Sequence, residues 1–286
     1  MAFRWVLTCV GLSFLLWPGS AMATTEADAL AVIAPATPAT AKKQSAVPSV
    51  TAEYAILIDA ADRRILFERS AMTPRPPAST TKIITALLGV DMGDPEEETI
   101  VSQHAGTTGE ASIHLFPGER VLFGDLLTGA LVKSGNDACV AIAEHIAGSE
   151  EFFALWMTTK ARLLGAKHSH FYNPNGLPHR LHVASAYDLA VVSAEAMRKE
   201  AFAAIVKQRY ATLEHRQGWP KEIKNTNKLL WSYPFADGIK TGTTKAAGAC
   251  LVASATKGDK HLIAVVLHSD DRFGDCQRLL EYGFNK

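Results

Sequence analysis

The segment Pro77–Leu88 constrains this chain most, because it combines a helix start with two chemically reactive side chains. Pro77 lacks a backbone N–H and disfavours helix at the residue before it, so the helix is expected to begin near Ala78 or Ser79. A helix with one buried stripe is expected from the apolar residues that follow at helical spacing, Ile83, Ile84, Leu87 and Leu88.

Ser79 and Lys82 lie three residues apart, so one helical turn places their side chains on the same face. A serine at the start of a helix beside a lysine amine is a candidate nucleophile with its own base, and the helix dipole favours an oxyanion there. Serine is also a favoured N-cap residue, so the pair taken alone is more simply explained by helix capping.

Composition indicates a globular protein. The 286 residues are 48% hydrophobic and 20% charged, which leaves room for one large domain or two modest ones. Lysine plus arginine and aspartate plus glutamate both number 29, so no basic excess points to nucleic-acid binding. Cys139, Cys250 and Cys276 have no close spacing and are expected to be small buried hydrophobes rather than a disulfide framework.

The N-terminus has the pattern of a targeting segment. Arg4 precedes the apolar run Trp5–Trp17, and Ala21–Ala23 has the small-x-small form of a cleavage site. The apolar run has 13 residues, whereas a spanning helix needs about 20, so cleavage is favoured over an uncleaved anchor. We expect a signal peptide at 1–23, a flexible linker at 24–50, a folded region at 51–286, and an exported protein with no stable membrane anchor.

The periodicity of the remaining chain predicts an α+β fold. Two short apolar runs at 55–59 and 64–68 predict a hairpin, and runs at 249–256 and 261–268 predict two more antiparallel strands. Helical spacing recurs at 125–132, 138–146, 150–164, 185–197 and 271–282. Strands at both ends of the chain are expected to join one antiparallel sheet flanked by helices, with a mainly helical subdomain from the middle of the chain.

A second candidate motif lies between two of these helices. Ser134, Gly135 and Asn136 form a short elbow, and a positive φ at Gly135 is expected to present the side chains of Ser134 and Asn136 together. The same residues are ordinary in a plain helix–helix turn. A third motif, Lys240-Thr241-Gly242, precedes the apolar run at 249–256.

The three motifs occur in the order of a known constellation. With Pro117–Glu119, Asn173–Leu177 and Asn225–Asn227, the sequence resembles the serine D-alanyl-D-alanine carboxypeptidases, the low-molecular-mass penicillin-binding proteins of peptidase family S11. The likeness runs from about Tyr54 to Phe284. It implies a β-lactamase/transpeptidase-like fold and identifies 51–286 as a penicillin-binding catalytic domain.

The resemblance also implies roles for the first two motifs. Ser79 would attack the penultimate D-alanine carbonyl of a peptidoglycan stem pentapeptide and form an acyl-enzyme. Lys82 would take the hydroxyl proton, with a pKa lowered by burial and by a second cation, Lys240. Ser134 would relay the proton to the departing D-alanine, and Asn136 would hold the substrate amide.

The third motif is implied to bind the substrate. Lys240 and Thr241 would face its terminal carboxylate, Gly242 would allow a close approach, and Thr243 N–H would share the oxyanion hole with Ser79 N–H. Penicillins would acylate Ser79, and the family role is cell-wall maturation in the periplasm or the equivalent extracytoplasmic space. No cofactor or metal is needed, and His168, His170, His179 and His182 are expected to be structural or surface residues.

Several alternatives remain at this point. The chain stops at Lys286, so the β-rich second domain and C-terminal anchor of many family members are not expected. A class A β-lactamase normally has Ser-Asp-Asn and a Glu-x-x-Leu-Asn loop, which this sequence lacks. A D,D-endopeptidase acting on cross-linked wall and an inactive wall-binding protein are the other readings, and the oligomeric state is open.

Overall fold

The computed structural model describes residues 46–109, 111–214 and 221–286, all within one compact unit, Gln44–Lys286. The predicted signal peptide and most of the predicted linker lie outside the described residues. Across the described residues, no helix combines the length and the apolar character needed to cross a bilayer.

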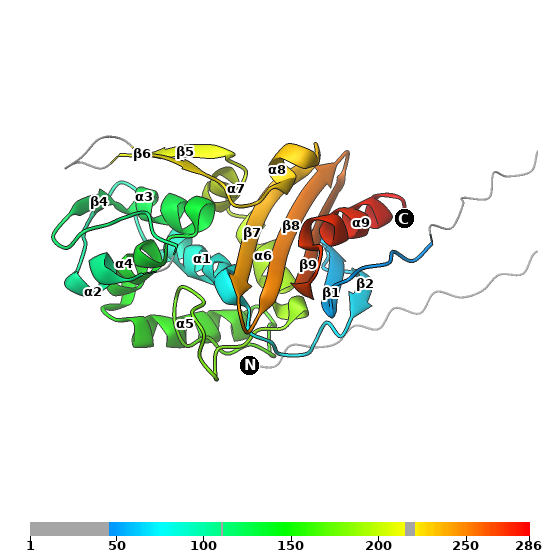
Figure 1. Cartoon of the computed structure of the whole chain (residues 1–286), viewed down its shortest axis with the longest axis horizontal. Coiled ribbons are helices and arrows are strands. Elements are labelled where there is room, and N and C mark those ends of the chain that lie inside the picture. Colours follow the sequence, from blue (N-terminus) through cyan, green and yellow to red (C-terminus); the bar gives the residue numbers. More distant parts are fainter. Residues whose placement is uncertain (1–45, 110, 215–220) are drawn as a thin grey trace, which may run out of the picture. The chain divides into compact units, whose positions relative to one another are not determined.

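A five-stranded antiparallel sheet forms one half of this unit (Figure 1). Its strands, in spatial order, are β2 (Ile65–Arg69), β1 (Tyr54–Asp59), β9 (Lys260–Ser269), β8 (Gly248–Lys257) and β7 (Ala236–Thr244). The predicted hairpin and the two predicted C-terminal strands are confirmed, and the sheet does join both ends of the chain. The fold is therefore α+β, as the periodicity predicts.

Both faces of the sheet are buried, and strand β9 shows why. Its side chains alternate between two apolar clusters, with Ile263, Val265 and Leu267 in one and Leu262, Ala264 and Val266 in the other. Helix α9 (Arg272–Phe284) contributes Cys276, Leu279 and Leu280 to the second cluster, and helix α6 (Ala186–Met197) packs on the opposite face. A strand covered on both faces reads as a continuous apolar run, which is how 261–268 appears in the sequence.

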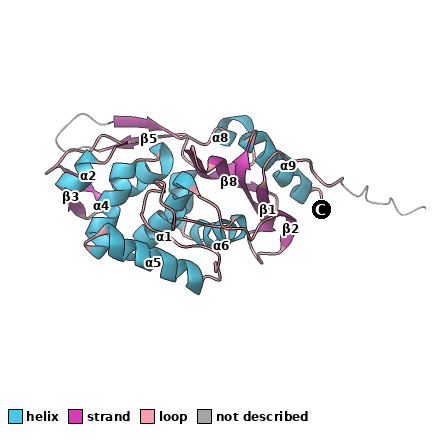
Figure 2. Ribbon diagram, turned by 60° about the horizontal axis from the view of Figure 1, so that its bottom comes forward, coloured by secondary structure: helices cyan, strands magenta, loops and turns pink. Residues whose placement is uncertain are grey.

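The helical half is built around α1 (Lys82–Met92), whose first eight residues are all buried. Figure 2 shows α1 among the helices α4 (Asn136–Ala147), α5 (Glu150–Leu163) and α6. The other elements are the 3₁₀ turn η1 (Ala78–Thr81), α2 (Gln103–Thr107), α3 (Phe123–Thr128), the π-helical turn η2 (Gly129–Lys133), α7 (Glu200–Val206), α8 (Leu229–Ser232) and the pairs β3 (Glu98–Ile100)/β4 (Arg120–Leu122) and β5 (Tyr210–Leu213)/β6 (Lys221–Lys224).

The sequence-based boundaries differ from the structure where helices change type. The helix expected at 125–132 is α3, which continues as the π-helical turn η2. The helix expected at 138–146 begins at Asn136 and ends before Gly148, whose φ of 75° is the left-handed conformation expected after a helix. Helices α2, α7 and α8 and the pair β5/β6 were not predicted, because elements of four to seven residues carry too few periods to be recognised.

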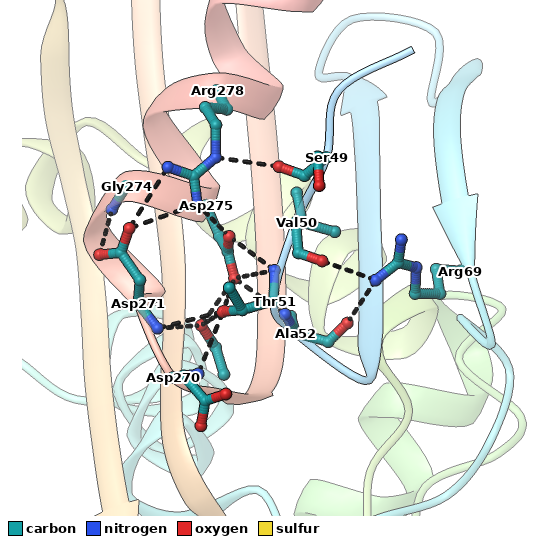
Figure 3. A network of polar contacts seen from close by, with 11 residues as sticks. Ser49, Val50, Thr51, Ala52, Arg69, Asp270, Asp271, Gly274, Asp275 and Arg278 are labelled. Atoms are coloured by element: carbon teal, nitrogen blue, oxygen red, sulfur yellow. Dashed lines mark hydrogen bonds and ion pairs between the residues drawn. The ribbon is translucent and has the colours of Figure 1, made fainter.

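A buried carboxylate fixes the point at which the folded region begins (Figure 3). Asp275 on α9 is fully buried and accepts hydrogen bonds from Thr51 N at 2.9 Å, Ala52 N at 2.9 Å, Thr51 Oγ1 at 2.8 Å and Ser269 Oγ at 2.7 Å. Arg278, one turn along α9, forms an ion pair with the same carboxylate. The segment before β1 is therefore held to α9 by a charged group with its hydrogen-bonding capacity used.

Two arginines complete this attachment. Arg278 Nε donates to Ser49 O at 3.0 Å, and Arg69 Nη1 donates to Val50 O at 2.7 Å and Ala52 O at 3.1 Å. Figure 3 shows the backbone of the segment between these two side chains. An extended segment with no regular partner strand thus has its carbonyls satisfied from both sides.

We predict that Asp275→Asn lowers the free energy of unfolding at pH 7 by about 3 kcal/mol, because Arg278 and the Thr51 amide lose the charge they are bonded to. Burial alone would raise the pKa of Asp275, but the hydrogen bonds from Thr51, Ser269 and Arg278 outweigh it and the pKa is lowered. This contribution is therefore present above the unfolded-state pKa of about 4 and is lost as pH falls through the lowered folded-state pKa.

Denaturant unfolding at pH 7 and at pH 3 measures this effect, and the difference between wild type and variant should shrink at the lower pH. Asp271→Asn is the matched control, since Asp271 is 53% exposed and also pairs with Arg278. Equal stabilities of wild type and Asp275→Asn at pH 7 would contradict the interpretation.

Candidate active site

Ser79 lies in the 3₁₀ turn η1, directly before α1. The N-cap of η1 is Pro77 and that of α1 is Thr81, and neither end has a side-chain capping bond. The capping explanation for Ser79 is therefore wrong. Its hydroxyl instead accepts a hydrogen bond from Lys82 Nζ at 3.1 Å.

The Lys82 amine is completely enclosed and is bonded to three segments of the chain. Besides Ser79 Oγ, its Nζ donates to Asn136 Oδ1 at 2.7 Å and to the backbone oxygen of Asn175 at 2.6 Å. The orientation of the Asn136 amide is fixed by its other end, where Nδ2 donates to Gly109 O at 3.2 Å. A carbonyl and an amide oxygen only accept, so Lys82 must donate to both of them in either protonation state.

This arrangement leaves one defined position for a lone pair. A neutral lysine has two N–H donors, which Asn136 and Asn175 take, and its lone pair then points at the remaining partner, Ser79 Oγ. Burial lowers the pKa of Lys82 from its ordinary value, while Cys139 and Asp137 oppose that shift. The site can therefore hold Lys82 as a base toward the Ser79 hydroxyl.

The elbow motif is positioned differently from the prediction. The residue with positive φ is Ser134, at 72°, and Gly135 has a φ of −57°. Glycine is required at 135 for space, because a Cβ there would lie 2.8 Å from Asp137 Oδ1 and 3.1 Å from Ile113 Cγ2. The prediction that Gly135 adopts a positive φ is therefore wrong, because the left-handed residue of the elbow is Ser134.

Asn136 reaches the site through its bond to Lys82, and Ser134 precedes it by two residues. The Ser134 side chain is buried, and within the described residues its hydroxyl has no hydrogen bond to Ser79 or Lys82. The structure therefore brings Ser79, Lys82 and Asn136 together through hydrogen bonds, and Ser134 precedes α4, the helix that carries Asn136.

The backbone oxygen of Asn175 is a site group that sequence reasoning missed. Its loop is folded by side-chain turns, since Asn173 Oδ1 accepts from Gly176 N at 2.8 Å and Asn175 Oδ1 accepts from Leu177 N at 3.1 Å. Gly176 has a φ of 88°, and a Cβ there would lie 2.0 Å from Ala78 O. Glycine and asparagine turn residues at 173–177 are the sequence signal that could have identified this loop.

Strand β7 lies against the serine turn. A Cβ on Gly242 would lie 3.0 Å from both Ser79 N and Thr80 N, so the two backbones approach as closely as a glycine permits. This places the Lys240-Thr241-Gly242 segment beside the nucleophile candidate, as the resemblance requires. Thr241 Oγ1 is 2.7 Å from Thr226 Oγ1, a partner that was not given a role from the sequence.

Lys240 is a second completely buried lysine. Its Nζ donates to Thr241 O at 3.1 Å, and burial together with the charge of Lys82 holds its pKa well below the ordinary value. The prediction was that both burial and Lys240 lower the pKa of Lys82, and the structure supports the contribution of burial. Burial is the main cause for Lys82, and the like-charge effect is resolved on Lys240.

Arg272 is another group that the sequence did not single out. Its Nη1 donates to Gly242 O at 2.9 Å and to Thr243 Oγ1 at 2.7 Å, so the first turn of α9 is attached to the end of the motif on β7. Thr243 itself is exposed, while Thr241 is buried and Gly242 is packed against the serine turn. Arg272 thereby fixes the orientation of the Gly242–Thr243 peptide.

Neighbouring cysteine and histidine side chains are structural. Cys139 is a free, buried thiol whose pKa burial raises to about 11, so it stays protonated and is shielded from thiol reagents. Cys250 and Cys276 are also free and buried, as predicted. His182 is buried, its Nε2 lies 2.8 Å from Thr81 Oγ1, and burial lowers its pKa to about 3, which keeps it neutral.

No group of three or more His, Cys, Asp or Glu side chains is arranged to hold a metal ion in the part of the chain that the structure describes.

Solved structures with the same fold define the class. A point mutant of the DD-transpeptidase of Streptomyces K15 superposes with a TM-score of 0.79 at 28% identity, covering 84% of this chain and 100% of that one. A D-alanyl-D-alanine carboxypeptidase from Mycobacterium tuberculosis H37Rv gives a TM-score of 0.80 at 29% identity, covering 85% and 95%. The fold is therefore that of the DD-peptidases.

The sequence comparisons are more specific. The family model described as D-alanyl-D-alanine carboxypeptidase, peptidase family S11, matches residues 40–271. Relatives named D-alanyl-D-alanine carboxypeptidase from Bacillus subtilis and Escherichia coli K12 are 36% and 37% identical over 82% and 83% of this chain. The chain belongs to the D-alanyl-D-alanine carboxypeptidase family S11. It spans about 62% of the length of these two relatives.

We predict that Gly176→Ala lowers the free energy of unfolding by more than about 2 kcal/mol, because the new Cβ both occupies a left-handed backbone position and meets Ala78 O. Gly165→Ala is the matched control, since Gly165 has a φ of 96° with nothing within 4 Å of the added Cβ. That control should cost only the backbone strain, about 1 kcal/mol. Denaturant unfolding measures both, and equal losses would show that the contact between 176 and the serine turn is unimportant.

Proposed function

We propose that this protein is a serine-type D-Ala-D-Ala carboxypeptidase that removes the terminal D-alanine from peptidoglycan stem pentapeptides through an acyl-enzyme on Ser79. The observation that carries the proposal is the bonding of the buried Lys82 amine, which leaves its lone pair for the Ser79 hydroxyl. The membership of family S11 supports the same substrate class.

In the proposed acylation step, Ser79 Oγ attacks the carbonyl of the penultimate D-alanine while its proton passes to Lys82 Nζ. The backbone N–H groups of Ser79 and Thr243 stabilise the tetrahedral oxyanion, and Ser79 lies at the positive end of α1. The proton then reaches the departing D-alanine amine through Ser134, and Asn136 binds the substrate amide. Water hydrolyses the resulting ester and regenerates the Ser79 hydroxyl.

The terminal carboxylate of the substrate is proposed to lie at Lys240 and Thr241. A buried lysine with no anionic partner has a lowered pKa, and a carboxylate beside it favours its charged form. Substrate binding thus places the proton on Lys240, and the two lysines repel, so the neutral form of Lys82 is favoured. In the complex, Lys240 is then the cation beside the substrate carboxylate, and Lys82 is the neutral base beside Ser79.

Location and inhibition belong to the same proposal. The segment 1–23 acts as a signal peptide, the segment 24–50 as a linker, and 51–286 as the catalytic domain, which works in the periplasm or an equivalent extracytoplasmic space. Penicillins carry a reactive amide and a carboxylate in the same relation as the substrate, so they acylate Ser79 as inhibitors. The physiological role is cell-wall maturation, with D,D-endopeptidase action on cross-linked wall as the alternative activity to be measured.

The first test is release of free D-alanine from a synthetic stem pentapeptide. We expect wild type to release it and Ser79→Ala to lose at least about 10⁴-fold in kcat/KM, because the covalent route is removed. A fluorescent penicillin should label wild type and not the variant. Slow hydrolysis of the pentapeptide with fast hydrolysis of penicillin would favour a β-lactamase, and absence of both reactions would favour a wall-binding protein.

The second test is the pH dependence of D-alanine release. Burial lowers the pKa of Lys82 below 10.5, and only its neutral form accepts the Ser79 proton. In the complex the substrate carboxylate keeps Lys240 charged, so kcat at saturating peptide should rise with pH and level off above a midpoint that lies below 10.5. Lys82→Arg should lose about 10³-fold and show no recovery at high pH, because arginine stays protonated. A wild-type kcat at saturating peptide that falls with increasing pH would contradict the role of Lys82, and thermal unfolding checks that the variant is folded.

A further inference from the structure

Helix α5 carries an apolar face that the rest of the described chain leaves exposed. Phe152, Leu155 and Leu163 are 63%, 60% and 80% exposed, and Trp156 lies among them with 38% of its surface exposed. Spacings of three, four and seven residues place these side chains on one side of the helix. Figure 2 shows α5 along the lower edge of the helical half, so this side is accessible to another molecule.

The opposite side of α5 belongs to the core of the protein. Phe153, Met157 and Ala161 follow one another at four-residue spacing and are completely buried. A helix that is apolar on two opposite sides is normally covered on both, and a contiguous exposed apolar patch marks an interaction site. The outer side of α5 therefore has the composition of an interface.

A groove of about 200 Å³ borders this face. Its walls are Met92 at the end of α1 and four residues of α5, Trp156, Thr159, Lys160 and Leu163. The charged group in the wall, the Lys160 ammonium, pairs with Asp91 at 2.8 Å, and Lys199 pairs with the same carboxylate at 2.6 Å. Because the charge of Lys160 is already compensated, the groove suits an apolar side chain.

The apolar face has an acidic end and a basic end. Glu151 lies in the first turn of α5 and Arg162 in the last turn, and both are exposed. Eleven residues are close to three full turns, so the two side chains lie on the same flank of the face, about 16 Å apart along the axis. They are too far apart to pair within one chain, and Arg162 has no ion-pair partner among the described residues.

A second copy of this chain has the complementary charges. When two α5 helices pack antiparallel about a two-fold axis, each flank meets the same flank of the partner. With the axis between Trp156 and Met157, Glu151 of one protomer lies level with Arg162 of its partner, and the reciprocal pair forms at the other end. An anionic membrane surface, by contrast, would attract Arg162 and repel Glu151, so the charge pattern favours a second copy.

The same arrangement fills the groove. Phe152 of one protomer lies level with Ala161 of its partner, between Thr159 and Leu163 in the groove wall. The groove has room for one aromatic ring, and burying such a ring removes a large apolar area from water. The two-fold axis places the second Phe152 in the first protomer's groove, so both copies make the same contact.

We propose that this protein forms a two-fold symmetric dimer through the outer face of α5, with Phe152 in the partner's groove and reciprocal ion pairs between Glu151 and Arg162. The interface meets α1 at its last residue, Met92, whereas Lys82 of the active site is its first residue. The dimer is therefore independent of the reaction proposed above, and it is tested by a measurement that needs no substrate.

The test is sedimentation equilibrium of the full chain at pH 7, from the low to the high micromolar range. We expect the average mass of wild type to rise from that of one chain toward that of two. Glu151→Arg and Arg162→Glu should each raise the dissociation constant about 10-fold, because two ion pairs in each dimer become two repulsions. The double variant should return to within about 3-fold of wild type, since the reversed pair has the same geometry. Phe152→Ala should raise the constant at least about 10-fold.

Glu200→Arg is the matched control. Glu200 is exposed in the first turn of α7, so the variant makes the same charge change at an equivalent helix position outside the proposed interface. Its dissociation constant should equal that of wild type, and circular dichroism checks that every variant is folded.

A wild type that stays monomeric at every concentration would overturn the proposal, and sedimentation with phosphatidylglycerol vesicles would then show whether a lipid surface covers the face instead. A dimer whose dissociation constant is unchanged in the single charge variants, or is not restored in the double variant, would exclude α5 as the interface.

Discussion

The active site depends on keeping the Lys82 amine away from solvent, with a hydrogen bond to each of three partners. Lys82 Nζ has no contact with solvent and its three partners come from the serine turn, the start of α4 and the loop at 173–177. Burying an ammonium group without compensation is costly, and this site offers neutral acceptors rather than a carboxylate, which favours the neutral amine. The basicity of the site toward Ser79 is therefore a property of how three distant segments pack, and not of the Ser-x-x-Lys spacing alone.

That packing is enforced by close backbone approaches on both sides of the serine turn. Gly176 lies against Ala78 O and Gly242 lies against the Ser79 and Thr80 amides, so the turn is held between a loop and a strand. The strand is fixed in turn by the sheet, whose two faces are covered by α6 and α9, and by Arg272 on α9. Distant parts of the fold thus determine the position of a 3.1 Å contact between Ser79 and Lys82.

Sequence patterns predicted the parts of this arrangement that repeat or carry reactive side chains. The apolar period of α1, the continuous apolar runs of β8 and β9, and the pairing of Ser79 with Lys82 all follow from residue type and spacing. The Asn175 carbonyl could not be predicted in the same way, because every residue has one and only its tertiary placement distinguishes it. Gly135 shows a related limit, since the sequence shows a glycine in the elbow but does not reveal whether it serves backbone freedom or lack of space.

The two buried lysines, Lys82 and Lys240, determine how charge is distributed in the site. Both have lowered pKa values, with burial as the leading cause, and only Lys240 lies on the strand proposed to meet the substrate carboxylate. A protein with two interacting amines titrates them as a pair, so an anion at one changes the protonation of the other. Under the proposed function, the empty enzyme need not hold Lys82 fully neutral, because binding of an anionic peptide end completes that step. Substrates without a terminal carboxylate would then react slowly through loss of the base as well as loss of binding.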